Sequence, residues 1–204
     1  MEFEGSRTAP GAAGPGAADD FFVTSVKIVV AGGFGVGKTT LVASVSEITP
    51  LTTEAVMTAA AENLDDISHT ADKTTTTVAM DFGRATLEAG LVLYLFGTPG
   101  QQRFWFMWDD LIHGAIGAVV LVDTRRLPDS FAAVDYFEAA RLPFIVAVNG
   151  FNGEFPHDLD EVREALSVRS QVPVIRCDAR ERESAKDVLA TLVEHALTVR
   201  LSLG

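Results

Sequence analysis

Short hydrophobic runs alternate with amphipathic stretches along the chain, and this alternation predicts its secondary structure. The short runs are rich in β-branched or aromatic residues and end at glycine, proline or polar residues, which is typical of strands. They lie at 26–31, 79–88, 91–96, 116–122, 144–148 and 172–175. The stretches with helical spacing lie at 38–47, 104–113, 130–140, 159–167 and 184–201.

The order of these elements predicts how they are connected. Strands that alternate with helices form a parallel sheet with helices on both faces. The runs at 79–88 and 91–96 are separated only by Ala89 and Gly90. That connection is too short for a crossover helix and indicates an antiparallel hairpin. We therefore expect an α/β three-layer sandwich whose six-stranded mixed sheet has one antiparallel edge strand.

Two segments fall outside this alternation. Residues 1–21 are rich in Gly, Ala and Pro, and we expect a disordered tail there, or alternatively a docking arm, ahead of a single domain at 22–204. Between 52 and 67, apolar residues follow helical spacing at Val56, Ala60, Leu64 and Ile67. The spacing predicts an added amphipathic helix, which either covers the sheet or binds a partner.

Composition and charge exclude several classes of function. The 204 residues are 48% hydrophobic and carry a net charge of −12. A chain of this kind is not disordered throughout, and it would repel a phosphate backbone, so we expect no nucleic-acid partner. Cys177 is the only cysteine, which excludes an internal disulfide. Because no apolar run reaches the ~18 residues of a membrane-spanning helix, we expect a cytoplasmic protein that reaches a membrane only through a partner.

The strongest motif is GGFGVGKT at 32–39, which matches G-x-x-x-x-G-K-[ST] and stands between a predicted strand and a predicted helix. Glycines allow the tight turn that points backbone N–H groups at a phosphate. In such a loop Lys38 contacts the β- and γ-phosphates and Thr39 offers its hydroxyl to Mg²⁺. An ordinary glycine-rich turn is the alternative. The predicted phosphate-loop contacts are Gly32, Phe34, Gly35, Val36, Gly37, Lys38, Thr39 and Thr40.

Four further segments resemble the motifs of Ras-like small GTPases, in the same order along the chain. FGTPGQQRF at 96–104 resembles D-T-A-G-Q-E-R-F, and TVAMDF at 77–82 resembles T-I-G-V-D-F. NGFN at 149–152 stands in the place of N-K-x-D, and CDAR at 177–180 in the place of S-A-K. The Thr-Pro-Gly-Gln form, with no Asp before it, is similar to the bacterial MglA-like and conservon (CvnD-like) branch. The resemblance implies the P-loop NTPase fold.

This resemblance implies a switch that binds GTP and GDP with Mg²⁺ and hydrolyses GTP. Lys38, Gln101 and Thr77 take the catalytic positions, although threonines at 74–76 leave the register of Thr77 open by one or two residues. Thr39 and Thr77 take the metal-ligand positions. The nucleotide contacts outside the phosphate loop are Gly100, Asn149, Asn152, Asp178, Ala179 and Arg180.

Two departures from the family pattern bear on hydrolysis. Gly97 replaces the aspartate that holds a magnesium-bound water, which predicts weaker Mg²⁺ binding. Phe34 replaces a glycine and is expected to crowd the γ-phosphate and the attacking water, which predicts slow turnover. Gln101 is in place to orient that water, or alternatively is a solvent-exposed loop residue.

Other departures bear on the nucleotide base. Asn152 replaces the aspartate that accepts hydrogen bonds from guanine, which predicts reduced guanine selectivity. The backbone N–H of Ala179 is still expected to meet the guanine O6. Gly150 replaces the lysine whose stem covers the base, and Phe151 is a candidate for that face.

Residues 104–108 place four aromatic side chains in five positions, and one helix cannot turn all of them toward the core. We therefore predict that Trp105 and Trp108 contact a partner. The resemblance implies a roadblock-type regulatory protein and a sensor-kinase-like complex as partners. Two other functions stay open, a nucleotide-binding scaffold with little hydrolysis and a P-loop small-molecule kinase.

Overall fold

The computed structural model describes residues 24–58, 75–87, 90–100 and 102–203. The tail predicted at 1–21 lies outside them. None of the helices in these ranges is long and apolar enough to cross a membrane. In chain order the elements are β1 Thr24–Gly32, α1 Lys38–Val45, β2 Leu51–Thr58, β3 Thr75–Leu87, β4 Leu91–Gly97, the 3₁₀ helix η2 Gln102–Met107, α2 Trp108–Ile112, β5 Ala115–Val122, the 3₁₀ helix η3 Thr124–Arg126, α3 Pro128–Ala140, β6 Phe144–Asn149, α4 Leu159–Ala165, β7 Val174–Cys177 and α5 Arg182–Leu203.

The described strands form one mixed sheet in the order β2-β3-β4-β1-β5-β6-β7. Strands β4, β1, β5, β6 and β7 are parallel. Strand β3 runs antiparallel to β4, and β2 runs antiparallel to β3. The α/β architecture and the hairpin predicted from the short connection at Ala89 and Gly90 are therefore confirmed, with Leu87 opposite Leu91.

The helix predicted at 52–67 is wrong over its first part, because Leu51–Thr58 forms strand β2. This strand pairs with the outer edge of β3, with Val56 opposite Thr77. An unpaired strand edge offers hydrogen-bond partners to a neighbouring segment rich in β-branched residues, and this tertiary pairing outweighs the four-residue spacing. The six predicted strands are all present, and β2 makes a seventh among the described residues. The antiparallel edge position predicted for 79–88 is therefore taken by β2, and β3 lies one strand inside it. Residues 59–67 lie outside the described residues.

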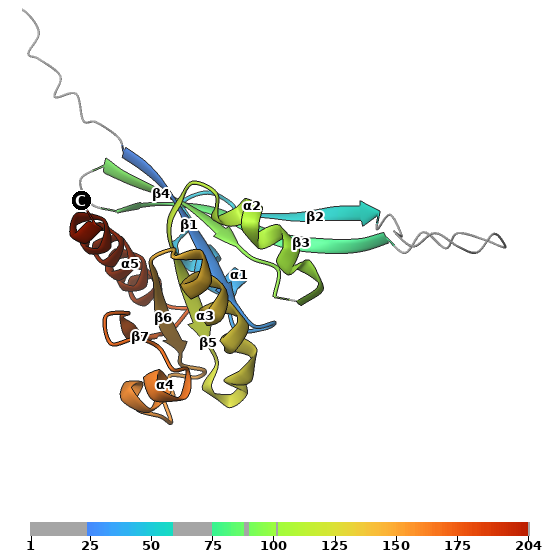
Figure 1. Ribbon diagram of the computed structural model, residues 1–204. Helices are drawn as coiled ribbons and strands as arrows, with labels where there is room; N and C mark the ends of the chain where they lie inside the picture. The colour runs from blue at the N-terminus through green and yellow to red at the C-terminus, as the bar shows by residue number, and fades with distance from the viewer. Residues whose placement is uncertain (1–23, 59–74, 88–89, 101, 204) are drawn as a thin grey trace, which may run out of the picture.

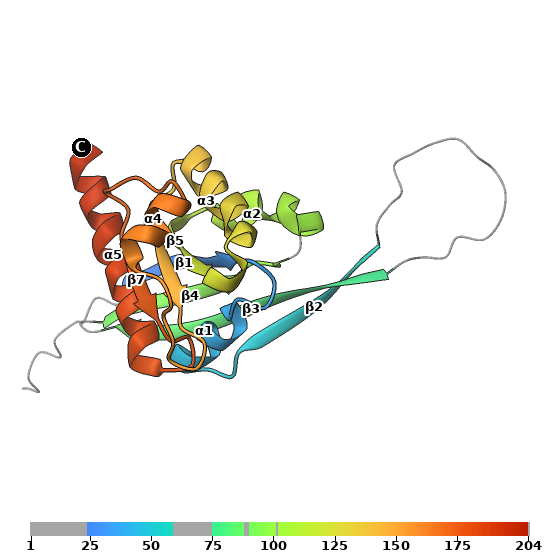
Figure 2. The ribbon, with the colours of Figure 1, turned by 90° about the horizontal axis from the view of Figure 1, so that it is seen from below.

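Helices cover both faces of the sheet (Figures 1 and 2). On one face α1 and α5 pack against the strands through residues such as Leu41 and Leu189, which are fully buried. On the other face α2, α3 and α4 bury Trp108, Phe137 and Val162. Alternate residues of the central strands belong to the two cores, which explains why those strands are continuous apolar runs in the sequence.

Strands β2 and β3 extend together beyond the rest of the sheet (Figures 1 and 2). The pairing of β3 with β4 begins only at Asp81, so the segment of β3 before it pairs with β2 alone. Asp81 therefore stands where this two-stranded ribbon joins the sheet.

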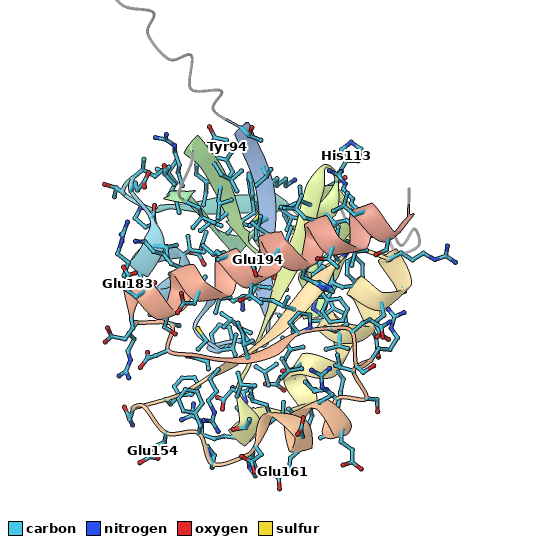
Figure 3. The ribbon with its side chains drawn as sticks, turned by 90° about the vertical axis from the view of Figure 1, so that its left-hand side faces the viewer. Tyr94, His113, Glu154, Glu161, Glu183 and Glu194 are labelled. Atoms are coloured by element: carbon cyan, nitrogen blue, oxygen red, sulfur yellow. The ribbon has the colours of Figure 1, made fainter. Side chains whose placement is uncertain are left out.

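The loops that follow the parallel strands gather at one end of the molecule. Figure 3 shows Glu154 and Glu161, which follow β6, at the opposite end from Tyr94 and His113. The segments after β1, β4, β6 and β7 all reach this end, because parallel strands share one carboxyl edge. Ligands of open α/β sheets bind at this edge, and the motifs found in the sequence lie there.

Candidate functional site

The phosphate loop connects the end of β1 to the start of α1. Gly37 is the N-cap of α1 and has a φ of 108°, in the left-handed region that favours glycine. A Cβ at this position would also lie 2.8 Å from Nδ2 of Asn149. Gly35 has a φ of 75°. The motif therefore adopts the tight turn predicted for it.

A cavity of about 310 Å³ opens in front of this loop. It is lined by Phe34, Gly35, Gly37, Lys38, Thr39, Thr40, Asp81, Thr98, Pro99, Gly100 and Phe104. The structure thus brings the phosphate loop together with Gly100, as the sequence predicted. It adds Asp81 and Thr98, which the sequence analysis did not assign to the site.

Lys38 lies buried at the base of the cavity, where its Nζ donates to the carbonyl oxygens of Gly32 (3.0 Å) and Gly33 (2.8 Å). Burial lowers the pKa of the Lys38 amine to about 8, and the nearby Asp81 carboxylate offsets part of this effect. An anionic ligand would bring a negative charge to this amine and favour its charged form, which raises its pKa.

Thr39 and Asp81 form a short polar contact in the cavity. The Thr39 hydroxyl donates to Oδ2 of Asp81 at 2.6 Å, and Asp81 is buried. Asp81 is directly opposite Gly97 in the β3–β4 pair. A Cβ at Gly97 would lie 3.0 Å from the Cβ of Asp81 and 3.1 Å from its Oδ2. A carboxylate from β3 therefore occupies the place left open by the missing side chain at residue 97.

The register of the predicted hairpin contains the information that places Asp81 opposite residue 97. A hairpin centred between Leu87 and Leu91 fixes the register of its two strands, so the residue six positions before Leu87 faces the residue six positions after Leu91. These residues are Asp81 and Gly97. The absence of the expected carboxylate at residue 97 could therefore have directed attention to its cross-strand neighbour.

Thr98 and Gly100 complete the wall of the cavity. The Thr98 hydroxyl is buried and has no hydrogen-bond partner among the described residues. A Cβ at Gly100 would lie 2.8 Å from Nζ of Lys38 and 2.9 Å from Cα of Phe34, which explains why this position requires glycine. The next residue, Gln101, lies outside the described residues, so its catalytic role stays a prediction.

Thr77 does not lie beside Thr39 along β3. It precedes Asp81 by four residues on the same strand, which corresponds to about 13 Å. Its role as a switch and metal-binding residue stays a prediction, and it requires this part of β3 to change conformation when a nucleotide binds.

A second hollow, of about 120 Å³, adjoins the first. It is lined by Gly37, Thr40, Asn149, Gly150, Phe151, Asn152, Asp178, Ala179 and Arg180. Gly37 and Thr40 line both cavities, so the two meet at the start of α1. The structure brings together every residue that the sequence analysis assigned to the nucleotide base.

Asn149 holds this second hollow in place through both ends of its side-chain amide. Its Nδ2 donates to the carbonyl of Val36 (2.9 Å), and its Oδ1 accepts from the backbone N–H of Ala179 (3.0 Å). One side chain thus links the phosphate loop, β6 and the loop after β7. The Ala179 N–H, expected to meet the guanine O6, is engaged by Asn149 in this structure.

Asn152 has a second role that sequence reasoning missed. It has a φ of 59°, Gly153 follows with a φ of 76°, and a bridge joins Phe151 to Glu154 around them. Asn-Gly is the preferred pair for a tight turn with two left-handed residues. Asn152 therefore shapes the turn as well as lining the base hollow.

The remaining base-pocket residues form an ion pair of their own. Arg180 hydrogen-bonds Asp178 through Nε (3.0 Å) and Nη2 (2.7 Å). These hydrogen bonds hold the pKa of Asp178 below its usual range. Both residues lie on the rim of the hollow, as the sequence predicted.

The aromatic segment after Gln101 differs from its prediction. Trp108 is only 2% exposed and stacks on Phe137 of α3, with ring centroids 5.8 Å apart. It is a core residue and not a free partner contact, because α3 offers it an aromatic face to pack against. Trp105 is partly buried against the same core. Phe106 is the exposed aromatic of this segment, at 60%.

Comparison with known proteins identifies the family. The family model described as conserved hypothetical ATP-binding protein matches residues 30–199, which include every site described above. The chain belongs to this family. A relative, the uncharacterized protein MJ1339 of Methanocaldococcus jannaschii, is 29% identical over 126 residues, which cover 61% of this chain and 69% of that protein.

Solved structures show that this member of the ATP-binding-protein family has a GTPase-like P-loop fold. The G domain of the T. maritima FeoB iron transporter is 19% identical with a TM-score of 0.59, over 84% of this chain and 99% of that one. The FeoB G domain from Methanococcus jannaschii is 14% identical with a TM-score of 0.57, over 85% of this chain and 98% of that one. Family and fold together indicate a nucleotide-binding protein.

Proposed function

We propose that the chain is a nucleotide-dependent switch that binds GTP and GDP with Mg²⁺ and hydrolyses GTP slowly. One observation carries this proposal. The cavity containing the buried Lys38 amine meets a second, narrower hollow at Gly37 and Thr40, so a polyphosphate and the base attached to it have adjoining places. Backbone amides at a helix N-terminus and a buried amine favour phosphate, and a narrow hollow fixes an aromatic base.

The residues of the first cavity suit Mg²⁺. Thr39 and Asp81 would hold the ion, since a hydroxyl and a carboxylate oxygen already in contact are the ligand types that Mg²⁺ prefers. The unpartnered hydroxyl of Thr98 fits a role in holding a water beside it. A bound Mg²⁺ neutralises charge on the phosphate oxygens. We assign to Asp81 the contribution that the sequence analysis considered lost at Gly97.

Slow hydrolysis follows from Phe34. Its side chain is 65% exposed and lines the phosphate cavity, and Gly100 approaches its backbone closely. A phenyl group there competes for space with the terminal phosphate and with a water that Gln101 would orient. The alternative of a nucleotide-binding scaffold with little hydrolysis shares this feature.

ATP is the second candidate ligand, because the family description names it. Two contacts favour considering it: the Ala179 N–H is engaged by Asn149, and Asn152 offers an amide in place of a carboxylate. Both reduce the acceptors and donors that guanine recognition uses. GTP remains the proposed ligand by resemblance to the small-GTPase motifs.

The nucleotide is identified by a binding panel. GTP, GDP, XTP and ATP are titrated by calorimetry into protein freed of co-purified ligand, with wild type and Asn152→Asp compared. We expect GTP and GDP to bind the wild type more tightly than ATP, and Asn152→Asp to increase the preference for GTP. Tighter binding of ATP would replace GTP by ATP in the proposal. Failure of all four ligands would remove the proposal.

The contribution of Mg²⁺ is tested in the same assay. We expect Asp81→Ala to abolish the difference in GTP affinity between buffers containing Mg²⁺ and EDTA. The exposed Asp135→Ala on α3 serves as a control for the loss of one negative charge. An Asp81→Ala protein with an undiminished response to Mg²⁺ would show that the ion is held elsewhere.

The proposed partners are a roadblock-type regulatory protein and a sensor-kinase-like complex, which belong with the MglA-like and conservon branch that the sequence resembles. The chain would be cytoplasmic and reach a membrane only through such a complex. Phe106 and Phe34 are exposed aromatics on segments beside the phosphate cavity, and they replace Trp108 as the proposed contacts. Single-turnover phosphate release, measured with and without a purified roadblock-type protein, distinguishes a switch from a scaffold.

A further inference from the structure

The base hollow lacks the side chain that the small-GTPase pattern places over the base. Gly150 stands at that position, and a Cβ there would meet the ring of Phe155. The Phe155 ring occupies the space where a stem at residue 150 would begin, so a side chain there would require this ring to move. Another residue must form this wall if a base is to be enclosed.

Phe151 is placed to form that wall. It lines the base hollow, and the tight turn at Asn152 and Gly153 fixes its backbone. The guanidinium of Arg125 lies over the Phe151 ring, with Cζ 3.7 Å from the ring centroid. Phe151 thus places an aromatic ring beside the hollow, and the planar guanidinium of Arg125 covers one face of this ring.

Arg125 is itself held in a fixed orientation by Asp123. Nε of Arg125 donates to Oδ1 of Asp123 (2.8 Å) and Nη2 donates to Oδ2 (2.7 Å), while the Arg125 backbone N–H also donates to Oδ1 (3.0 Å). The Asp123 side chain is 11% exposed and that of Arg125 is 58% exposed. Because the Arg125 partner is exposed to solvent, the pair adds little to stability. The two-point contact with the carboxylate does hold the plane of the guanidinium in one orientation, whereas an arginine without a partner would rotate freely.

We propose that the base of a bound nucleotide packs against the aromatic ring of Phe151. We further propose that Arg125, anchored by Asp123, is the positioning residue that fixes the orientation of this ring. The inference rests on the proposed nucleotide binding and adds the residues that recognise the base. In this proposal three side chains replace the single lysine of the small-GTPase pattern: one in η3, one at the N-cap of η3 directly after β5, and one in the turn after β6.

The experiment compares a ligand that has a base with one that does not. The affinities of GTP, ATP and inorganic tripolyphosphate, each with Mg²⁺, are measured for wild type, Arg125→Ala, Phe151→Ala and the double variant. We expect each single variant to weaken the nucleotides about three- to tenfold and to leave tripolyphosphate unchanged. The double variant should lose little more than Phe151→Ala alone, because Arg125 acts through that ring.

Asp123→Asn separates positioning from simple charge. This variant keeps an oxygen to accept the Arg125 backbone N–H but releases the guanidinium and leaves its charge unbalanced. Positioning predicts weaker nucleotide binding, as in Arg125→Ala. Simple attraction of phosphate predicts tighter binding of both nucleotides and tripolyphosphate. Arg169→Ala, which removes a similar exposed pair with Glu138, is the matched control.

The outcomes are distinct. Three results would each overturn the inference while leaving nucleotide binding intact. The first is an equal loss of affinity for nucleotides and tripolyphosphate in Arg125→Ala. The others are additive losses of affinity in the double variant and unchanged affinities in all variants. A wild-type protein that binds tripolyphosphate but neither nucleotide would overturn it together with the base part of the proposed function. Binding of none of the three would remove the proposed function itself.

Discussion

Asp81 supplies a carboxylate from β3 at a place where the small-GTPase pattern supplies one from residue 97 on β4. The two positions face each other across β3 and β4, and only one of them carries a side chain. Cross-strand neighbours on one face lie close together, so we expect a carboxylate at either position to reach the space beside Thr39, which Asp81 contacts. The departure at Gly97 therefore changes the strand that supplies the carboxylate, while the proposed contribution to the ion is kept.

Exchanging the two residues tests this interpretation. Gly97→Asp alone should destabilise the protein by about 1–3 kcal/mol, because its Cβ would lie 3.0 Å from the Cβ of Asp81. Asp81→Gly alone should lower the Mg²⁺-dependent affinity for GTP at least tenfold. The double exchange should recover stability in urea unfolding and part of the Mg²⁺ response. A double variant whose Mg²⁺ response is no larger than that of Asp81→Gly would show that the carboxylate must come from β3.

The single cysteine gives a prediction about pH. Burial raises the pKa of the Cys177 thiol to about 11, so at pH 8 roughly one molecule in a thousand carries the thiolate. We expect native protein to react slowly with a disulfide reagent such as Ellman's at pH 8, with the rate rising as the pH approaches 11. Protein unfolded in guanidinium should release one equivalent at once. Rapid labelling of the native protein would contradict the buried position of Cys177.

At the residue scale, the sequence predicted contacts that depend on backbone spacing and missed those that depend on pairing across strands. The phosphate-loop residues and the base-pocket residues after β6 and β7 meet as predicted, because each motif follows a strand at the same edge. Asp81, Arg125 and Phe155 were missed, because their roles come from neighbours distant in sequence. The role of Thr77 depends on a conformation that spacing does not reveal.

At the scale of elements, the segment η2–α2 is fixed to the body of the protein by aromatic packing. Trp108 stacks on Phe137, Tyr136 meets Trp108 edge-on, and the Tyr136 hydroxyl donates to Asp109 at 2.6 Å. Burial and this hydrogen bond raise the pKa of Tyr136, so the hydroxyl keeps its proton at any ordinary pH. Conformational change near Gly100 is therefore expected to end before Trp108.

Substitutions in this segment separate a core role from a surface role. Trp108→Ala should lower the free energy of unfolding by about 3–5 kcal/mol, because a fully packed indole is lost. Phe106→Ala should change it by less than about 0.5 kcal/mol, because its ring is exposed. Urea unfolding followed by circular dichroism measures both. Comparable losses would mean that Phe106 is also packed.

Element types were predictable where packing and local preference agree. The central strands are apolar throughout because both faces are covered, and the helices carry their apolar residues on one side. The sequence failed at β2, where four apolar residues with helical spacing compete with a strand edge offered by β3. Periodicity in one segment carries no information about an unpaired edge formed some twenty residues later.

At the scale of the whole molecule, the two cavities at the carboxyl edge of the sheet are lined by segments that follow four different strands, so a ligand filling both would contact all four. Binding therefore contributes to the stability of the entire fold. A ligand at a hundred times its Kd adds about 2.7 kcal/mol.

We expect Mg²⁺ with GTP at that excess to raise the Tm by about 5–10 °C in a protein of this size. Lys38→Met should remove most of the shift, because the buried amine is the principal cation of the cavity. Lys186→Met, a half-buried lysine on α5 that pairs with Glu183, is the control. A shift that persists in Lys38→Met would place the ligand outside the phosphate cavity.

The carboxylate that meets Thr39 arrives on an outer antiparallel strand, while the phosphate loop belongs to the parallel interior. These two parts of the sheet differ in how much of the molecule holds them, since β3 before Asp81 has only β2 beside it. Asp81 is the first residue of β3 that β4 also pairs, so fraying of the ribbon up to and including that pair would withdraw the carboxylate proposed to hold the ion, without unfolding the rest. If the proposed ion binds there, its affinity would include the free energy of closing the ribbon, and its occupancy would report whether β2 and β3 are docked.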